Sequence, residues 1–297
     1  MAVKSKENMR WELVSNIVMI ILSLFAFLPF WLLIAGSLTE EHTAVKYGYK
    51  FIPDKFSLSA YEYIFEEWTQ IGRAYGITLI VTVIGTFASV MIIMMASYAL
   101  THKDVIGIKL VSFLIIFTML FNGGIVPTYL VYNNILHLKN TIFGLIVPNL
   151  LCNGFNIVLV RSYIQSNIPS ALIEAAEIDG AGQLTIFNKV IMPLSKPIIA
   201  TIGLLNGVAY WNDWTNGLYY ITDSRLYSIQ QLLNEINNNI SYLSSNASSI
   251  SGIDISSLPS NTIRMAIACV AILPILCLYP FFQKYFSKGI TLGAVKG

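Results

Sequence analysis

The stretch "EAAEIDGAGQLTIFNKVIMPLSKP" at residues 174–197 differs sharply from its surroundings. It holds three acidic residues, Glu174, Glu177 and Asp179, within six positions, and two glycines interrupt it. Long apolar runs lie on both sides of it. The environment of those runs therefore decides where this acidic segment lies and what it contacts.

The composition indicates a membrane protein. Of 297 residues, 55% are hydrophobic and 11% are charged, whereas about 25% of the residues in an ordinary soluble domain are charged. A single soluble core of this size cannot bury so much apolar surface. The net charge of +2 does not favour nucleic acid as a partner. The three cysteines and three histidines lack metal-ligand spacing, so we expect no catalytic residue and no metal site.

Six apolar runs are long enough to cross a bilayer, which takes about 20 residues. The first run is too long for a signal peptide, and five more follow it. We therefore predict an all-α membrane protein whose six transmembrane helices lie at about residues 14–36, 76–100, 108–132, 142–160, 197–220 and 264–286.

The distribution of lysine and arginine predicts the orientation of the spans. With the N-terminal residues 1–13 in the cytoplasm, 11 of the 18 basic residues lie on the inside. Both termini are then cytoplasmic, and the loops 38–72 and 221–262 are outside. The acidic stretch falls in the long cytoplasmic loop 161–196, so it needs no place in lipid.

The local pattern in this loop predicts two short helices with a bend between them. Pro169 suits a first helical turn, and Gly180 suits a C-terminal cap. Glu174 and Glu177 share one side of the first helix, and a second amphipathic run ends at Pro193. One apolar stripe is expected on the first helix: Ile168, Ala171, Leu172, Ala175 and Ile178. This is either an interfacial helix-turn-helix whose acids face water, or a docking surface for another protein.

The loop resembles the EAA loop of ATP-binding-cassette (ABC) importer permeases. In that pattern Glu-Ala-Ala is followed by three residues and Gly, then by nine residues and an aliphatic-any-aliphatic-Pro sequence. The matching residues here are Glu174, Ala175, Ala176, Gly180, Val190, Ile191, Met192 and Pro193.

Other segments resemble the MalG-type sugar permeases of the same group. These are "FIPDKFSLSAYEYIF" at 51–65, "YWNDW" at 210–214 and "KGITLGAVKG" at 288–297. The stretch "FNGGIVPTYL" at 121–130 resembles a branch linked to complex oligosaccharides. The resemblance implies a type I ABC importer transmembrane domain over residues 14–297, in a bacterial cell membrane, that takes up a carbohydrate.

The resemblance also implies partners. The chain has no GxxxxGK[ST] phosphate loop, so it is expected to be no enzyme and to bind no cofactor itself. ATP and Mg would be bound by two copies of a separate ATPase subunit. A second homologous permease would complete a heterodimer, and an extracellular solute-binding lipoprotein would deliver the sugar. The tail 288–297 would reach the ATPases or fray. The coupling residues implied are Glu174, Ala175, Ala176, Glu177, Asp179, Gly180 and Pro193.

Polar residues inside spans are costly and usually face the interior of a bundle, so they are candidates for the substrate path. Gly123, Gly124 and Pro127 interrupt the third run, which opens backbone toward a cavity. The alternative is that the asparagines bond helices to one another. The path candidates are Asn122, Asn153, Asn156, Asn206, Tyr210, Trp211 and Asn212.

Other classes of function fit less well. An ion-coupled secondary transporter expects charged residues near the middle of its spans, and a membrane enzyme expects convergent titratable groups; the runs offer neither. A polyol or glycerol-phosphate substrate stays open within the importer interpretation, although a phosphate would favour cationic groups along the path.

Overall fold

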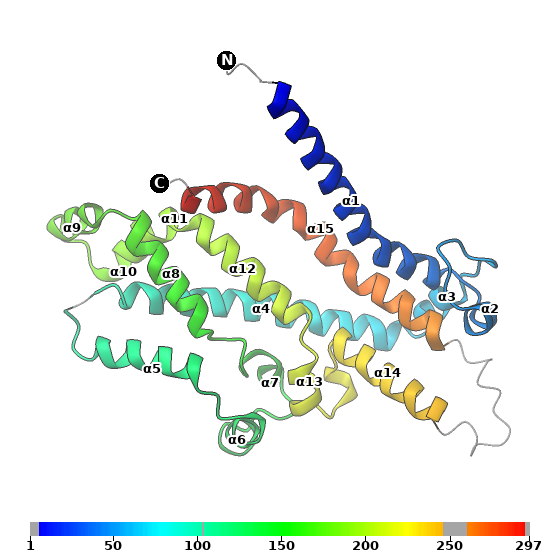
Figure 1. Ribbon diagram of the computed structural model, residues 1–297. Helices are drawn as coiled ribbons and strands as arrows, with labels where there is room; N and C mark the ends of the chain where they lie inside the picture. Colours follow the sequence, from blue (N-terminus) through cyan, green and yellow to red (C-terminus); the bar gives the residue numbers. More distant parts are fainter. Residues whose placement is uncertain (1–5, 103, 246–259, 295–297) are drawn as a thin grey trace. The chain divides into compact units, whose positions relative to one another are not determined.

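The computed structural model describes residues 6–102, 104–245 and 260–294 (Figure 1). Within these residues the fold is helical and has no β-strand, only one isolated bridge between Thr39 and Phe56. The expected all-α class is therefore confirmed. The chain divides into two compact units, Met1–Thr69 with Glu235–Leu273, and Gln70–Asn234 with Pro274–Gly297.

In the first unit, the segment after α1 is fastened to the start of α15. The Glu41 carboxylate accepts hydrogen bonds from the Asn261 N–H at 3.0 Å, the Thr262 N–H at 2.8 Å and the Thr262 hydroxyl at 2.6 Å. It thereby caps the N-terminus of α15 from another helix. The elements are α1 (Lys6–Ser37), α2 (Glu41–Tyr47), α3 (Ser59–Glu66) and parts of α14 (Ile229–Ser245) and α15 (Ser260–Ala294).

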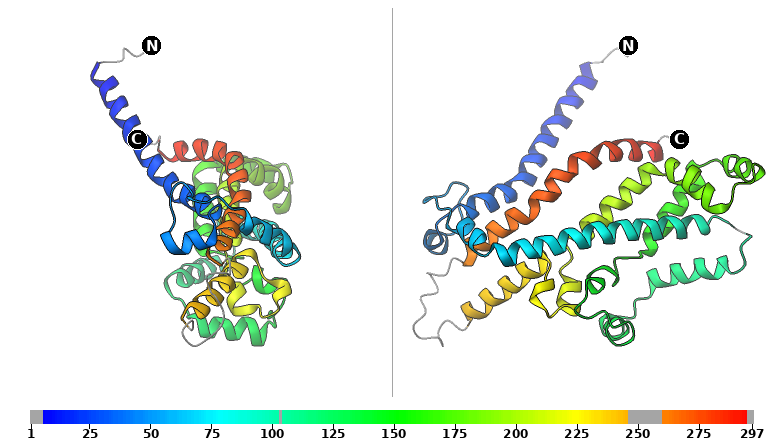
Figure 2. Two further views of the ribbon diagram at one scale, coloured as in Figure 1. Left: turned by 90° about the vertical axis from the view of Figure 1, so that its right-hand side faces the viewer. Right: turned by 180° about the vertical axis from the view of Figure 1, so that it is seen from behind.

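The second unit is built on α4, α8 and α12, which lie side by side (Figures 1 and 2). The Ser97 hydroxyl of α4 donates to the Ile157 carbonyl of α8 at 2.9 Å. The elements of this unit are α4 (Trp68–Ala99), α5 (Ile108–Leu120), α6 (Ile125–Leu130), η1 (Val131–Ile135), α7 (Ile142–Ile146), α8 (Gly154–Asn167), α9 (Ser170–Ile178), α10 (Gln183–Ile186), η2 (Phe187–Ile191), α11 (Met192–Leu194), α12 (Lys196–Trp211), α13 (Thr215–Tyr220) and η3 (Ser224–Leu226).

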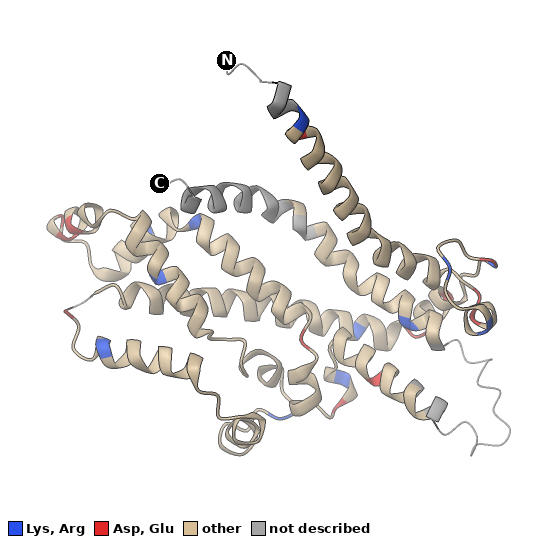
Figure 3. Cartoon of the chain, in the orientation of Figure 1, with Lys and Arg blue, Asp and Glu red and all other residues tan. Residues whose placement is uncertain are grey.

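Two described helices, α1 from Arg10 and α4, are long and apolar enough by length and composition to cross a membrane. A third candidate is the pair 183–194 and 196–211, whose two parts meet at 82°. Shorter apolar helices are α5 and the part of α15 over Asn261–Cys277. Figure 3 shows how few charged residues lie along α4 and α12. The count of six spans and the cytoplasmic termini stay predictions.

The third and fourth apolar runs are interrupted. The break predicted in the third run is confirmed, because α5 ends at Leu120 and α6 begins at Ile125. The expected continuous helix 142–160 is wrong, because α7 ends at Ile146 and α8 begins at Gly154. Pro148 disfavours helix at the residue before it, and Asn149 has a φ of +62° in a tight turn closed by the Leu150 N–H on the Pro148 carbonyl.

The fifth and sixth runs also differ from their expected bounds. The helix in 197–220 ends at Trp211 rather than continuing, because Asp213 accepts from the N–H groups of Thr215 and Asn216 and starts α13. Helix α15 extends beyond 264–286 at both ends. The expected contact of the tail 288–297 with ATPases falls on side chains outside the described residues.

Candidate functional site

The bend of the acidic loop is a helix C-cap of defined geometry. Helix α9 ends at Ile178, and Gly180 has a φ of +78°. The Ala181 N–H donates to the Ala176 carbonyl at 2.9 Å, and the Gly180 N–H donates to the Glu177 carbonyl at 3.0 Å. This is the Schellman arrangement, which needs a left-handed residue at the position of Gly180. The predicted glycine bend is confirmed.

Helix α9 turns one face to the core and another outward. Ile173 and Ala176 pack against the core of the second unit. Leu172 is 46% exposed and Ile178 is 86% exposed, and Ala171 and Ala175 lie exposed between them. The expected stripe is therefore divided, because Ile168 precedes α9 and is buried in the core instead. The exposed part remains a continuous apolar face on the helix.

The three acidic residues of the loop have different surroundings. The Glu177 carboxylate accepts a hydrogen bond from the Gln183 amide at 3.0 Å. Glu174 and Asp179 are exposed, and within the described part of the chain neither side chain has a hydrogen bond or ion pair. Figure 3 shows that acidic residues gather on α9. Glu174 and Asp179 are thus available to a partner, whereas Glu177 acts within the chain.

A chain of hydrogen bonds attaches α9 to α4. The Tyr98 hydroxyl of α4 donates to the Gln183 carbonyl oxygen at 2.7 Å, and the Gln183 amide nitrogen donates to Glu177. Tyr98 also packs edge-on against His102, with ring centroids 4.8 Å apart. The Gln183 side chain thus accepts from α4 through its carbonyl oxygen and donates to α9 through one of its two N–H groups. Gln183 was not among the residues expected from the sequence.

We expect Gln183→Leu to loosen this attachment without unfolding the chain, because Gln183 is exposed and two hydrogen bonds are lost, each contributing about 0.5–1.5 kcal/mol. If α9 transmits motion, the variant of the complete transporter should hydrolyse ATP with a several-fold smaller response to substrate. The neighbouring Thr185→Val, also exposed, is the matched control. An unchanged response in Gln183→Leu would show that the Tyr98–Gln183–Glu177 chain has no role in transmission.

The second half of the loop joins α12 at a sharp angle. Ile186, Phe187 and Ile191 are buried, and η2 is a π-helical turn directly before α11. Pro193 and Pro197 lie four residues apart, so the amide that would bond the Pro193 carbonyl is absent from Pro197. The helix axis changes by 82° at this point. Pro193 therefore sets the direction in which the loop enters α12.

Two of the expected path residues bond each other. The Asn156 amide donates to the Asn206 carbonyl oxygen at 3.1 Å, and the Asn206 amide donates to the Ser89 hydroxyl at 2.9 Å. All three side chains are buried. These two hydrogen bonds join α4, α8 and α12. The geometry therefore favours the alternative that Asn156 and Asn206 bond helices to one another.

The other path candidates have separate surroundings. Asn153 caps α8 by accepting from the Phe155 N–H at 2.9 Å. The buried Tyr210 donates to the Ile146 carbonyl at 2.9 Å. Asn212 accepts from Gln230 at 3.3 Å and is exposed. Trp211 is buried and packs edge-on against Tyr75. The structure does not bring these residues to one surface.

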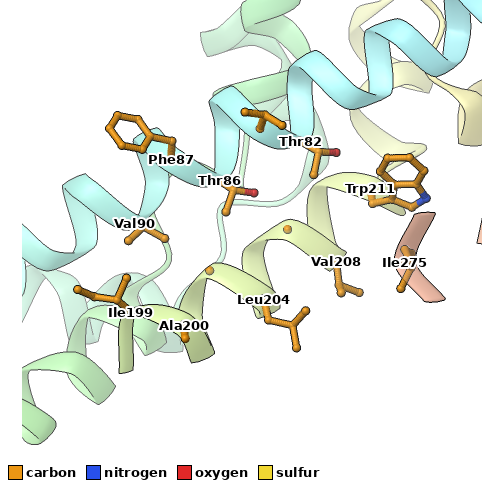
Figure 4. Close-up of a pocket in the computed structure, with 13 residues that line it drawn as sticks. Thr82, Thr86, Phe87, Val90, Ile199, Ala200, Leu204, Val208, Trp211 and Ile275 are labelled. Carbon is orange, nitrogen blue, oxygen red and sulfur yellow. The ribbon is translucent and has the colours of Figure 1, made fainter. Parts of the chain in front are cut away.

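Trp211 lies at one end of an apolar groove of about 420 Å³ (Figure 4). The groove runs between α4 and α12, and Ile275 of α15 closes it near Trp211. The polar side-chain atoms on it are the Thr82 and Thr86 hydroxyls and the indole nitrogen of Trp211. So apolar a surface suits a helix or lipid and does not suit a hydroxylated substrate.

Asn122 lines a different and polar pocket of about 130 Å³, together with residues of α6, α13 and the turn at Asn149. None of the other expected path residues lines it. Sequence reasoning missed Asn149, although an asparagine directly after Pro148 indicates a turn. It also missed Asp213, because that residue falls within an otherwise apolar run. No group of three or more metal-ligating side chains occurs among the residues described.

The chain matches a known family and several known proteins. The family described as "Binding-protein-dependent transport system inner membrane component" matches residues 90–292. The polygalacturonan/rhamnogalacturonan transport system permease protein YtcP of Bacillus subtilis (strain 168) is 41% identical over 94% of this chain and 96% of its own. Protein LplC of the same organism is 37% identical over 91% of this chain and 89% of its own.

A solved structure is also similar. It is the crystal structure of a bacterial ABC transporter involved in the import of the acidic polysaccharide alginate. The matched chain is 29% identical, with a TM-score of 0.79, over 96% of this chain and 100% of that chain.

Proposed function

Because this chain belongs to the family of inner membrane components of binding-protein-dependent transport systems, we propose that it forms half of the membrane path of an ABC importer for an oligosaccharide. Sugar names among its relatives support the substrate class, including polygalacturonan/rhamnogalacturonan and melibiose/raffinose/stachyose. A second, homologous permease forms the other half. A solute-binding lipoprotein delivers the sugar, and two ATPase subunits bind ATP and Mg.

The observation that carries this proposal is the exposed apolar face of α9. Leu172, Ala175 and Ile178 lie on it, and a solvated helix gains nothing from exposing them. Glu174, Glu177 and Asp104 line a polar groove of about 760 Å³ beside α9. An apolar face next to a carboxylate-lined groove suits a cleft with apolar walls and a basic residue, which the ATPase would supply.

The proposed mechanism is a lever action. The core contacts of Ile173, the Schellman turn and the bonds of Gln183 hold α9 to the rest of the second unit. When the two ATPases close on ATP, α9 moves as a rigid body and carries α12 with it through the bend at Pro193. The membrane path then changes from inward-open to outward-open. The groups of this chain that take part are Glu174, Ala175, Ala176, Glu177, Asp179, Gly180 and Pro193.

Six spans with both termini inside belong to this proposal, and they predict that α9 and α14 lie on opposite sides. Ser170 at the start of α9 and Asn238 on α14 are both exposed. Single cysteines at these positions, in a chain whose three native cysteines are replaced, should react differently with an impermeant maleimide on intact cells. Asn238→Cys should be labelled and Ser170→Cys should not. Labelling of both from outside would exclude the six-span topology.

We predict that Glu174→Lys weakens association with the ATPase, because it places a cation opposite the proposed basic residue. A hydrogen bond to a charged group contributes roughly 1.5–3 kcal/mol, and charge reversal adds repulsion. Co-purification of the ATPase with the permease is the measurement. Asp54→Lys, an exposed acid on the predicted outside, is the control. Full recovery of the ATPase with Glu174→Lys would show that Glu174 is only a solvated acid.

The function itself is tested with the complete importer in proteoliposomes. The binding protein is supplied with oligosaccharides cut from rhamnogalacturonan, and ATP hydrolysis and uptake of labelled sugar are measured together. We expect both to rise only when ATP, binding protein and an oligosaccharide are present. Uptake driven by an ion gradient without ATP would contradict the proposal and favour a secondary transporter.

A further inference from the structure

The polar pocket beside Asn122 arises where the third apolar run breaks. Gly124 has a φ of +84°, and the Asn122 side-chain oxygen accepts from the Gly124 N–H at 2.9 Å. The Thr128 hydroxyl donates to the Gly124 carbonyl at 2.7 Å. These bonds keep the chain open between α5 and α6, so the backbone does not fill the space. The opposite wall is α13 (Figure 1).

Several polar groups of this pocket are left without a protein partner. Within the described residues, none of the following makes a hydrogen bond: the Asn122 amide nitrogen, the Asn149 side chain, and the Thr215 and Tyr219 hydroxyls. Asn149, which has a positive φ, also lines the pocket. By contrast, the buried Asn216 is satisfied by the carbonyls of Leu145 and Pro148. The free groups are therefore those that a ligand would meet.

Three tyrosines give the pocket aromatic walls. Tyr129 and Tyr220 stack with ring centroids 5.8 Å apart, and Tyr219 lines the same space. None of the described residues that line the pocket is charged. Amide and hydroxyl groups pair with ligand hydroxyls in both directions, whereas a carboxylate would find no cation to pair with among these lining residues. The volume of about 130 Å³ is well below that of a drug-sized site, at about 300–1,000 Å³, so one ring fits.

We propose that this pocket is a subsite for one uncharged sugar ring at the outer end of the membrane path, made by Asn122, Asn149, Thr215 and Tyr219. This inference rests on the proposed function, since α6 and α13, which line the pocket, lie apart from α9 within the second unit (Figures 1 and 2). It deepens that function, because an oligosaccharide with both acidic and neutral units would place a neutral unit here.

The test measures binding and needs neither ATP nor the binding protein. The complete importer is placed in lipid nanodiscs, since maltoside detergents are themselves sugars. Saturation-transfer NMR then compares methyl α-D-galactopyranoside with methyl α-D-galactopyranosiduronate, which differ only in the carboxylate. We expect the neutral galactoside to bind and the uronate to bind at least about fivefold more weakly.

The double variant Thr215→Val with Tyr219→Phe removes only two hydroxyls, neither of which makes a hydrogen bond among the described residues. It should weaken galactoside binding at least about fivefold while leaving the thermal unfolding midpoint unchanged. Thr185→Val with Tyr47→Phe, the same changes at exposed positions outside the pocket, should have no effect.

Equal binding of the uronate, or binding unaffected by the double variant, would overturn the subsite. These outcomes are separate from a failure of the proposed function, which would appear as absent ATP-driven uptake in the unmodified importer. If the unmodified importer takes up sugar normally and the double variant binds the galactoside as well as the unmodified protein does, the pocket is not a sugar subsite.

Discussion

Gly180→Val should abolish sugar-stimulated ATP hydrolysis and uptake while leaving the protein at its normal abundance in the membrane. A β-branched residue at a φ of +78° is strained by on the order of 1–3 kcal/mol. Apart from its two chain neighbours, no residue has an atom within 4 Å of the position that a Cβ would take, so the strain comes from the local backbone alone. Relieving it breaks the turn between Ala176 and Ala181 and redirects α9.

The same loop provides a control for this variant. Gly182 lies two residues further, with φ −70° and ψ 159°, and it also has open space around it. Valine adopts such an extended conformation readily, so Gly182→Val should keep most of the uptake. The measurements are the ATPase rate and labelled-sugar uptake in proteoliposomes with binding protein present. Full uptake by Gly180→Val would mean that the turn does not transmit the motion.

Ile178→Asp should prevent the ATPase from binding, at little cost to the stability of the chain. Ile178 is 86% exposed, so the folded chain loses almost no packing. In a cleft of the partner, however, the new carboxylate would be buried without a cation. At the centre of an interface, such a change typically costs more than about 2 kcal/mol of binding free energy. Co-purified ATPase should fall by at least about tenfold.

Ile106→Asp is the matched control. Ile106 is fully exposed in the connection between α4 and α5, on the same predicted side of the membrane, and it is not on α9. It should leave ATPase recovery unchanged. If both variants lose the ATPase equally, the interface is broader than α9. If neither loses it, the exposed apolar face of α9 is not the docking surface.

Local chemistry in the sequence was enough for several features. Apolar composition indicated a membrane protein, and the glycines at 123 and 124 predicted the break after Leu120. Pro169 and Gly180 bounded α9 within a residue or two. These features depend on a few neighbouring residues whose backbone preferences act wherever the segment lies. Such preferences are readable without knowing any distant contact.

The fourth apolar run shows where reading the sequence failed. A run of 19 mostly apolar residues met the length rule, but Pro148 and a positive φ at Asn149 divide it. Apolar content measures where a segment prefers to lie, and it does not measure whether its backbone is continuous. In the fifth run, likewise, the helix ends at Trp211 despite the apolar composition, because Asp213 caps the start of α13.

Only the tertiary structure decided which polar residues are free. Asn156 and Asn206 looked like Asn122 in the sequence, but they pair with each other across 50 residues of chain, and Asn206 also donates to Ser89 across 117. Tyr219 and Asn149 became candidates because α13 and the turn after α7 meet beside Asn122. Likewise, packing buried Ile168 and left Ile178 exposed, although both fitted one stripe. A residue's type sets what it can bond, whereas its partners are set by helices that the sequence does not place side by side.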